Sequence, residues 1–77
     1  MATVEQIKAA RALLAWSQED LAAHSQVSLP TVRRFEARSK LRVSEDTRLK
    51  MEAALEAAGI EFTNGSAPGV RLHRREG

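Results

Sequence analysis

Five Arg or Lys residues stand against a single Glu between residues 33 and 42, where the charge of the chain is most concentrated. Counting Lys and Arg against Asp and Glu gives −1 for residues 1–32, +4 for 33–42, −3 for 43–70 and +2 for 71–77. The total of +2 is small, but a local concentration of positive charge attracts polyanions through its own potential. These residues therefore favour the binding of phosphates, and a nucleic acid is the expected ligand.

The other residue types give little support to catalysis or metal binding. The absence of cysteine excludes disulfides and thiolate zinc sites. Neither His24 nor His73 has a persuasive set of Cys, His and carboxylate neighbours at ligand spacing, so we expect no metal site and no cofactor. Three of the serines stand at predicted helix starts, and no histidine is placed as a base for any serine, so we expect no catalytic residue and no enzyme.

The length of 77 residues allows one hydrophobic core, because so small a domain buries only about 60% of its unfolded surface. Only three residues are aromatic, so Ala, Leu, Val and Ile must build most of that core, and this composition favours helices. The longest apolar run, ALLAW, is far shorter than the roughly 20 residues of a membrane span, and the N-terminus does not resemble a signal peptide. We therefore expect a cytoplasmic protein without membrane contact.

Four helices are predicted, each preceded by a hydroxyl residue whose oxygen can accept from a free backbone N–H of the first turn. The predicted caps are Thr3, Ser17, Ser28 and Ser44. The predicted helices span about residues 4–15, 18–25, 29–37 and 45–58. Gln6 completes a capping box with Thr3, and Gly59 ends the fourth helix.

The pattern changes from helix to strand after Gly59. IEFT alternates apolar and polar residues, NGSAPG is dense in turn residues, and VRL follows, so the sequence predicts two short strands joined by a loop. An isolated hairpin is marginal in water, so these strands must pack on the helices or pair with another chain. We thus divide the chain into a helical domain, 1–58, and a C-terminal β and basic extension, 59–77.

Three interpretations of this extension remain open. Its strands can pair across a two-fold axis and form a dimer, or they can fold back on their own helices with dimerisation elsewhere. The last residues, RLHRREG, can also form a disordered basic arm that follows the DNA backbone or enters a minor groove. The apolar residues expected at a dimer contact are Ile60, Phe62, Val70 and Leu72.

The second and third predicted helices are joined by a short turn and so form a helix-turn-helix arrangement. The stretch SQEDLAAHSQVSLPTVRRFEA resembles the helix-turn-helix domain of the phage-repressor and Cro type, the XRE family of bacterial transcription regulators. The matching positions are Ser17, Gln18, Leu21, Ala22, Val27, Ser28, Val32, Phe35 and Glu36. The resemblance covers residues 4–58 and implies a compact, all-α, lambda-repressor-like domain of four or five helices, here with a short β-strand or hairpin extension. It also implies operator DNA as the ligand and usually a homodimer, nucleoid-associated when bound to DNA.

The resemblance offers a partner for Arg11, which stands on the otherwise apolar face of the first predicted helix. Arg11 and Glu36 occupy positions that commonly form a structural salt bridge in this family. The chain departs from the family at three positions that often carry glycine, occupied here by Ala15, Gln26 and Arg38. A non-glycine residue in a left-handed conformation costs on the order of 1 kcal/mol, so the turn at Gln26 is either strained or remodelled.

The docking of the family places DNA contacts at the start of the second helix and along the third. Gln18 would lie beside phosphates, and its amide can also brace a base-reading side chain. Arg34 is expected to read a base, because arginine can bond guanine O6 and N7 together. Leu29 and Pro30 can pack on a thymine methyl, although Leu29 can instead cover an edge of the core. The full set of expected DNA contacts is Gln18, Ser28, Leu29, Pro30, Thr31, Arg33, Arg34, Arg38, Lys40 and Arg42, of which Arg33, Arg38, Lys40 and Arg42 are expected to hold phosphates.

These features predict a sequence-specific DNA-binding transcription regulator, a dimeric repressor that binds a pseudo-palindromic operator through its third helix. Repression by occupying an operator requires nothing beyond the domain, which is why we prefer it to activation. The alternative is a protein-binding module, such as the antitoxin of a toxin and antitoxin pair. Its C-terminal segment would then hold a protein partner, and DNA binding would be autoregulatory or lost.

Overall fold

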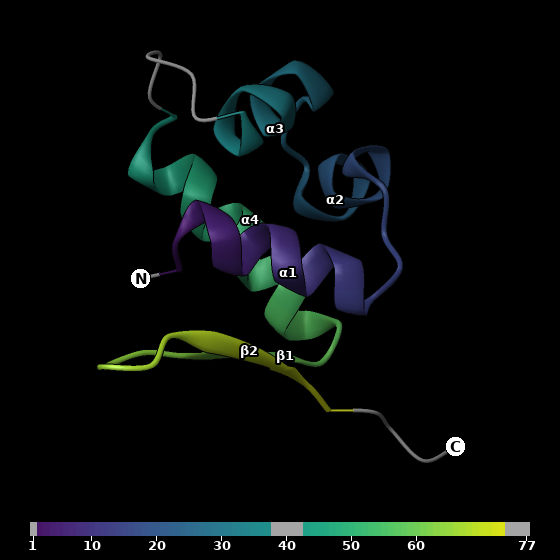
Figure 1. The fold of residues 1–77 in the computed structure, drawn as a ribbon. Coiled ribbons are helices and arrows are strands. Elements are labelled where there is room, and N and C mark those ends of the chain that lie inside the picture. Colours follow the sequence, from purple (N-terminus) through teal and green to yellow (C-terminus); the bar gives the residue numbers. More distant parts are fainter. Residues whose placement is uncertain (1, 38–42, 74–77) are drawn as a thin grey trace.

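The computed structural model describes residues 2–37 and 43–73, which form four helices followed by a β-hairpin (Figure 1). The elements are α1 (Val4–Leu13), α2 (Gln18–Ser25), α3 (Leu29–Glu36), α4 (Glu45–Ala57), β1 (Ile60–Thr63) and β2 (Gly69–Leu72). The helical domain with a hairpin extension agrees with the prediction, although the strands mean that the chain is not purely all-α. The predicted phosphate contacts Arg38, Lys40 and Arg42 lie outside the described residues, as does the end of the expected basic arm, 74–77.

Each helix begins where a hydroxyl oxygen accepts a hydrogen bond from a backbone N–H of the first turn. Thr3 accepts from the N–H of Gln6, and the Gln6 side chain accepts in return from the N–H of Thr3. Ser17 forms a second capping box at the start of α2, and Ser28 and Ser44 cap α3 and α4. The predicted helix starts are therefore confirmed.

The end of α1 lies at Leu13, about two residues before the predicted end. Ala15 has a φ of 56°, in the left-handed region, which an α-helix cannot continue through. The N–H of Trp16 bonds the carbonyl of Arg11 at 2.9 Å, and the N–H of Ala15 bonds that of Ala12 at 3.0 Å. These two bonds form a Schellman motif, so the alanine takes the conformation that glycine often supplies in the family.

The core draws on all four helices. Its largest fully buried side chains are Ile7 on α1, Leu21 on α2, Val32 on α3, and Met51 and Leu55 on α4. Apolar residues of the hairpin complete this single cluster. None of the described helices is long and apolar enough to cross a membrane.

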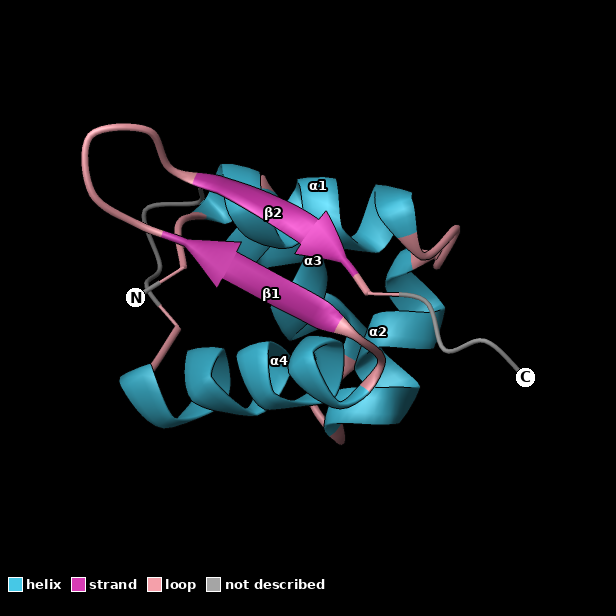
Figure 2. Ribbon diagram, turned by 90° about the horizontal axis from the view of Figure 1, so that it is seen from below, coloured by secondary structure: helices cyan, strands magenta, loops and turns pink. Residues whose placement is uncertain are grey.

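The hairpin covers the core on the side away from α3. Its antiparallel strands place Ile60 opposite Leu72 and Phe62 opposite Val70. Because strand side chains alternate between faces, these four residues share one face, and that face packs on the core. β2 lies against α1 and β1 against α4 (Figure 2). The four residues expected at a dimer contact are thus engaged with the helices of their own chain.

Gln6 ties the loop end of the hairpin to α1, a role that the sequence pattern did not predict. Its buried amide nitrogen donates to the carbonyls of Thr63 at 2.7 Å and Gly69 at 2.9 Å. Thr63 and Gly69 face each other at the last pair before the loop. Since the amide oxygen accepts from Thr3, one glutamine side chain joins the start of α1 to both strands.

Candidate nucleic-acid interface

The turn between α2 and α3 depends on Gln26, which has φ 59° and ψ 31°. Its N–H bonds the carbonyl of Ala22, and the N–H of Val27 bonds the same carbonyl at 3.2 Å. The Val27 side chain is buried in the core, whereas Gln26 is exposed. The sequence predicted that this turn is either strained or remodelled. The structure agrees with a strained turn, because Gln26 itself takes the left-handed conformation.

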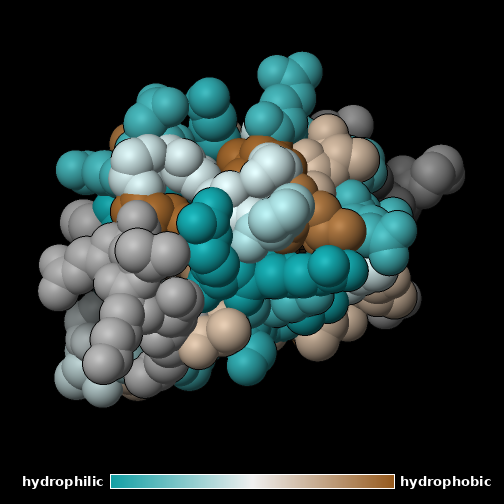
Figure 3. Space-filling model, turned by 90° about the horizontal axis from the view of Figure 1, so that it is seen from above, coloured by the Kyte–Doolittle hydropathy of each residue, from teal (hydrophilic) through white to brown (hydrophobic). Residues whose placement is uncertain are grey.

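α3 has a buried side and an exposed side. Val32 and Glu36, four residues apart and hence on one face of the helix, are buried. Pro30 and Arg34, also four residues apart, are exposed on the opposite side, and the neighbouring Arg33 is exposed as well. Figure 3 looks down on this side of the molecule and shows hydrophilic side chains with smaller hydrophobic patches between them. The only acidic residue of α3 is the buried Glu36, so the exposed side of this helix carries positive charge alone.

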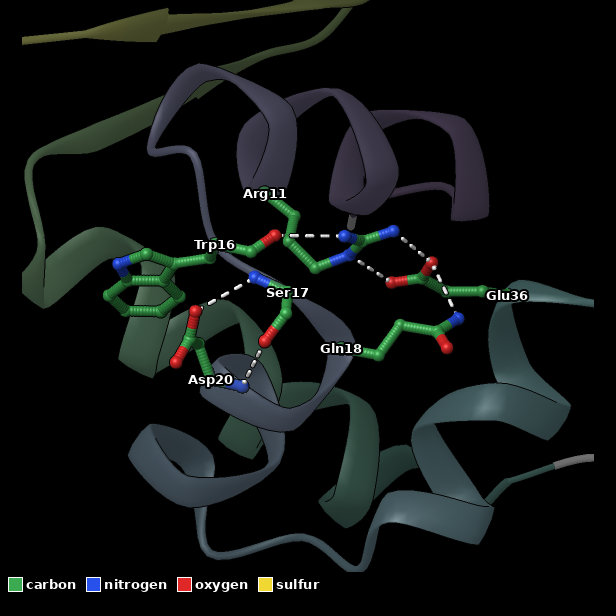
Figure 4. A network of polar contacts seen from close by, with 6 residues as sticks. All are labelled: Arg11, Trp16, Ser17, Gln18, Asp20 and Glu36. Atoms are coloured by element: carbon green, nitrogen blue, oxygen red, sulfur yellow. Dashed lines mark hydrogen bonds and ion pairs between the residues drawn. The ribbon is translucent and has the colours of Figure 1, made fainter.

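A network of polar contacts holds α3 from behind (Figure 4). Arg11 donates from Nε to Oε2 of Glu36 at 2.9 Å and from Nη2 to Oε1 at 2.7 Å. Its Nη1 donates to the backbone carbonyl of Trp16 at 2.8 Å. Gln18 donates from Nε2 to Oε1 of Glu36 at 3.2 Å. One carboxylate at the end of α3 is thus bonded by the first residue of α2 and by an arginine of α1.

The charges of this network stabilise one another. Burial raises the pKa of Glu36, but the hydrogen bonds from Arg11 and Gln18 and the charges of Arg11 and Lys8 outweigh it, so the pKa lies below its ordinary value. The hydrogen bond to Glu36 raises the pKa of Arg11. Both groups are therefore ionised at neutral pH. An ion pair with two parallel hydrogen bonds fixes orientation as well as distance, which suits a contact that sets the angle of a helix.

The leading edge of α3 carries a chain of three polar side chains. The hydroxyl oxygens of Ser28 and Thr31 are 2.7 Å apart, and the N–H of Thr31 donates to Ser28 Oγ at 3.3 Å. Arg34 donates from Nη2 to Thr31 Oγ1 at 3.4 Å. The cap of the helix is thus linked through one threonine to the exposed arginine one turn along.

The comparison with protein families agrees with this arrangement. A family model described as Helix-turn-helix matches residues 7–59, which is more than half of the chain. The chain belongs to the XRE family of helix-turn-helix proteins. No curated protein matches it. Because the family comprises regulatory DNA-binding domains, this helix-turn-helix protein is a DNA-binding regulator.

Several of the predicted DNA contacts of the helix-turn-helix protein lie together at the start and along the exposed side of α3. Leu29 is half-buried but is not part of the core cluster, and Thr31 is also half-buried. The exposed members of the group are Ser28, Pro30, Arg33 and Arg34.

The side chain of Gln18 does not brace a base-reading side chain, as the resemblance had suggested it can. It is half-buried at the first position of α2, and its amide nitrogen is bonded to Glu36. Its backbone N–H still belongs to the first turn of α2, where an N–H has no acceptor within the helix. The side chain therefore belongs to the network behind α3, while its backbone remains a candidate phosphate contact.

Trp16 and His24 form a contact that the sequence did not indicate. Their rings stack with centroids 4.2 Å apart and an angle of 10° between the planes. Trp16 is half-buried against the core, and His24 covers it from the last turn of α2. The position of both residues at helix junctions was the only signal available, and it does not specify a partner.

Proposed function

We propose that this helix-turn-helix protein is a sequence-specific transcription regulator that places α3 in the major groove of its operator. The observation that carries this proposal is the exposed line of Pro30 and Arg34 on a helix fixed from behind by Glu36. A side chain discriminates between bases only if the helix that carries it has a defined register in the groove. The network around Glu36 supports such a register.

The side chains of α3 divide by the kind of contact they can make. Arg34 would bond O6 and N7 of a guanine, and Leu29 and Pro30 would contact a thymine methyl. Arg33, together with Arg38, Lys40 and Arg42, would hold phosphates, which sets affinity and salt dependence and carries little sequence information. Ser28 and the backbone at Gln18 would add hydrogen bonds to the phosphates that flank the groove.

We further propose that the protein acts as a homodimeric repressor. The hairpin lies on the opposite side of the molecule from α3 (Figure 1). A two-stranded hairpin has two open edges, and antiparallel pairing of one edge with a second copy creates a two-fold axis perpendicular to the sheet. Such an axis keeps both α3 helices on the same side, as a pseudo-palindrome with half-sites about 34 Å apart requires.

In this dimer the apolar face of each hairpin remains packed on the core of its own chain. The residues of this face are Ile60, Phe62, Val70 and Leu72. Residues 1–58 would bind DNA and 59–77 would join the two copies. The mass in solution tests this part of the proposal: at micromolar concentration we expect twice the mass of one chain, and a monomer would contradict it.

Selection of bound duplexes from a random DNA pool tests the proposal that the protein binds a specific DNA sequence. We expect a single enriched motif with an inverted repeat, whose half-sites are separated by about one helical turn. A pool that shows no enrichment after several rounds, or a selected duplex that a scrambled duplex displaces equally well, would contradict the proposal.

A further inference from the structure

We propose that Thr31 is a positioning residue that holds the Arg34 guanidinium in the orientation in which it reads a base. This inference rests on the proposed function, because it concerns how the same site gains specificity. Its basis is the 3.4 Å bond from Arg34 Nη2 to Thr31 Oγ1 and the 2.7 Å contact of that hydroxyl with Ser28 Oγ.

The direction of these bonds follows from the chemistry of the groups. A guanidinium has donors and no acceptor, so Thr31 Oγ1 accepts from Arg34. The two hydroxyls of Ser28 and Thr31 have one proton each, and the bond between them uses one of these protons. Thr31 Oγ1 can therefore accept from Arg34 whichever of the two hydroxyls donates to the other.

An exposed arginine needs such support if it is to discriminate between bases. Its long side chain has rotamer entropy of about 2 kcal/mol, part of which is lost when it is fixed against a base edge. A partner that restricts the side chain before binding lowers this cost. The neighbouring Arg33 is also exposed, but its side chain has no partner within residues 2–37 and 43–73. The difference between the two arginines matches the proposed division between a base contact and a phosphate contact.

The amide of Gln18 does not supply this support. Its nitrogen donates to Glu36, on the buried side of α3, whereas Arg34 lies on the exposed side. Thr31 is half-buried and follows directly on Pro30 in the first turn of α3. Among the described residues it is the side chain that connects Arg34 to the fixed start of the helix.

A double-mutant cycle tests the proposal, with a duplex that the wild type has selected from a random pool and a scrambled duplex as probes. Dissociation constants are measured for the wild type, Thr31→Val, Arg34→Ala and the double variant. Thr31→Val keeps the shape of the side chain and the N–H that bonds Ser28 but removes the hydroxyl. We expect it to weaken binding to the selected duplex about three- to tenfold and to leave binding to the scrambled duplex and the salt dependence unchanged.

The coupling between the two residues decides between positioning and direct contact. If Thr31 acts through Arg34, Thr31→Val has no further effect in the Arg34→Ala background. Thr31→Ser keeps the hydroxyl and is expected to bind like the wild type. Losses that multiply in the double variant, or a Thr31→Val protein that binds like the wild type, would overturn the proposal.

Two controls keep the result interpretable. Circular dichroism and thermal unfolding establish that each variant folds, and Thr31→Ala takes the place of Thr31→Val in the cycle if the valine variant does not fold. A wild type that fails to distinguish the selected from the scrambled duplex would contradict the proposed function itself. A specific wild type with uncoupled Thr31 and Arg34 would contradict only the role of Thr31.

Discussion

Arg11 on α1 and Glu36 at the end of α3 share two hydrogen bonds, of 2.9 and 2.7 Å, across 25 residues of sequence. Glu36 lies on the side of α3 opposite to Arg34, so the helix proposed to read DNA is held through its buried side. The carboxylate is more deeply buried than the guanidinium, with 3% and 21% of the side chains exposed. This asymmetry predicts how substitutions of the pair will differ.

Arg11→Met is expected to lower the free energy of unfolding by about 3 kcal/mol or more, because it leaves a buried carboxylate without its cation. The double variant Arg11→Met/Glu36→Leu should be more stable than Arg11→Met alone, since both charges are then absent. Urea denaturation followed by circular dichroism measures both values. Arg11→Met with wild-type stability, or a double variant less stable than the single one, would show that the pair does not hold the helices together.

Glu36 also makes the stability of the fold depend on pH. Its pKa is lower in the folded than in the unfolded chain, so it stabilises the fold at pH values above the unfolded pKa. This contribution is lost as the pH falls through the lowered folded pKa. Glu36→Gln should therefore lose less stability than the wild type between neutral pH and that acidic range, whereas Glu56→Gln on the exposed side of α4 should follow the wild type. Denaturation curves over this pH range make the comparison, and identical slopes for all three proteins would contradict it.

Gln26→Gly is expected to raise the free energy of unfolding by about 0.5–1 kcal/mol. Glycine adopts the left-handed conformation at φ 59° without a Cβ clash, although its more flexible unfolded chain offsets part of the gain. Ala53→Gly, on the exposed face of α4, is the matched control and should lose about 1 kcal/mol. Equal losses in the two variants would mean that position 26 is not held in a left-handed conformation.

Gly59→Ala should be more destabilising than Gly65→Ala by about 1 kcal/mol or more. Both glycines have a positive φ, of 107° and 93°, so alanine is strained at either position. A Cβ at Gly59 would lie 2.6 Å from the backbone oxygen of His73, whereas a Cβ at Gly65 meets no atom within 4 Å. Thermal unfolding of the two variants separates the clash from the strain. Equal midpoints would contradict the close approach of the Gly59 and His73 backbones.

The local features of this fold could be predicted from the sequence because their causes lie within a few residues. Thr3 and Ser17 cap the helices that follow them, and Gly59 ends α4, through contacts across one helical turn. The strand at residues 60–63 follows from the alternation of IEFT. The pair of Arg11 and Glu36 followed only from the resemblance to a family, since neither residue indicates the other by spacing.

The contacts that the sequence did not reveal join distant parts of the chain. The partners of Gln6 in the hairpin are 57 and 63 residues away, and nothing near Gln6 distinguishes it from an ordinary member of a capping box. The resemblance to the family predicted that Gln18 lies beside DNA, but it did not indicate that its amide bonds Glu36. For the four apolar residues of the strands, alternation predicted a shared face but not which surface would cover it.

The most direct test of the account compares Arg34→Ala with Arg33→Ala on the selected and the scrambled duplex over a range of salt concentrations. Arg34→Ala should reduce the preference for the selected duplex by roughly 10- to 100-fold, because it removes a base contact. Arg33→Ala should weaken binding to both duplexes alike and lower the salt slope by about one, as the loss of a phosphate contact does. If Arg34→Ala instead weakened binding to both duplexes equally and kept the preference, α3 would not read the operator through this residue.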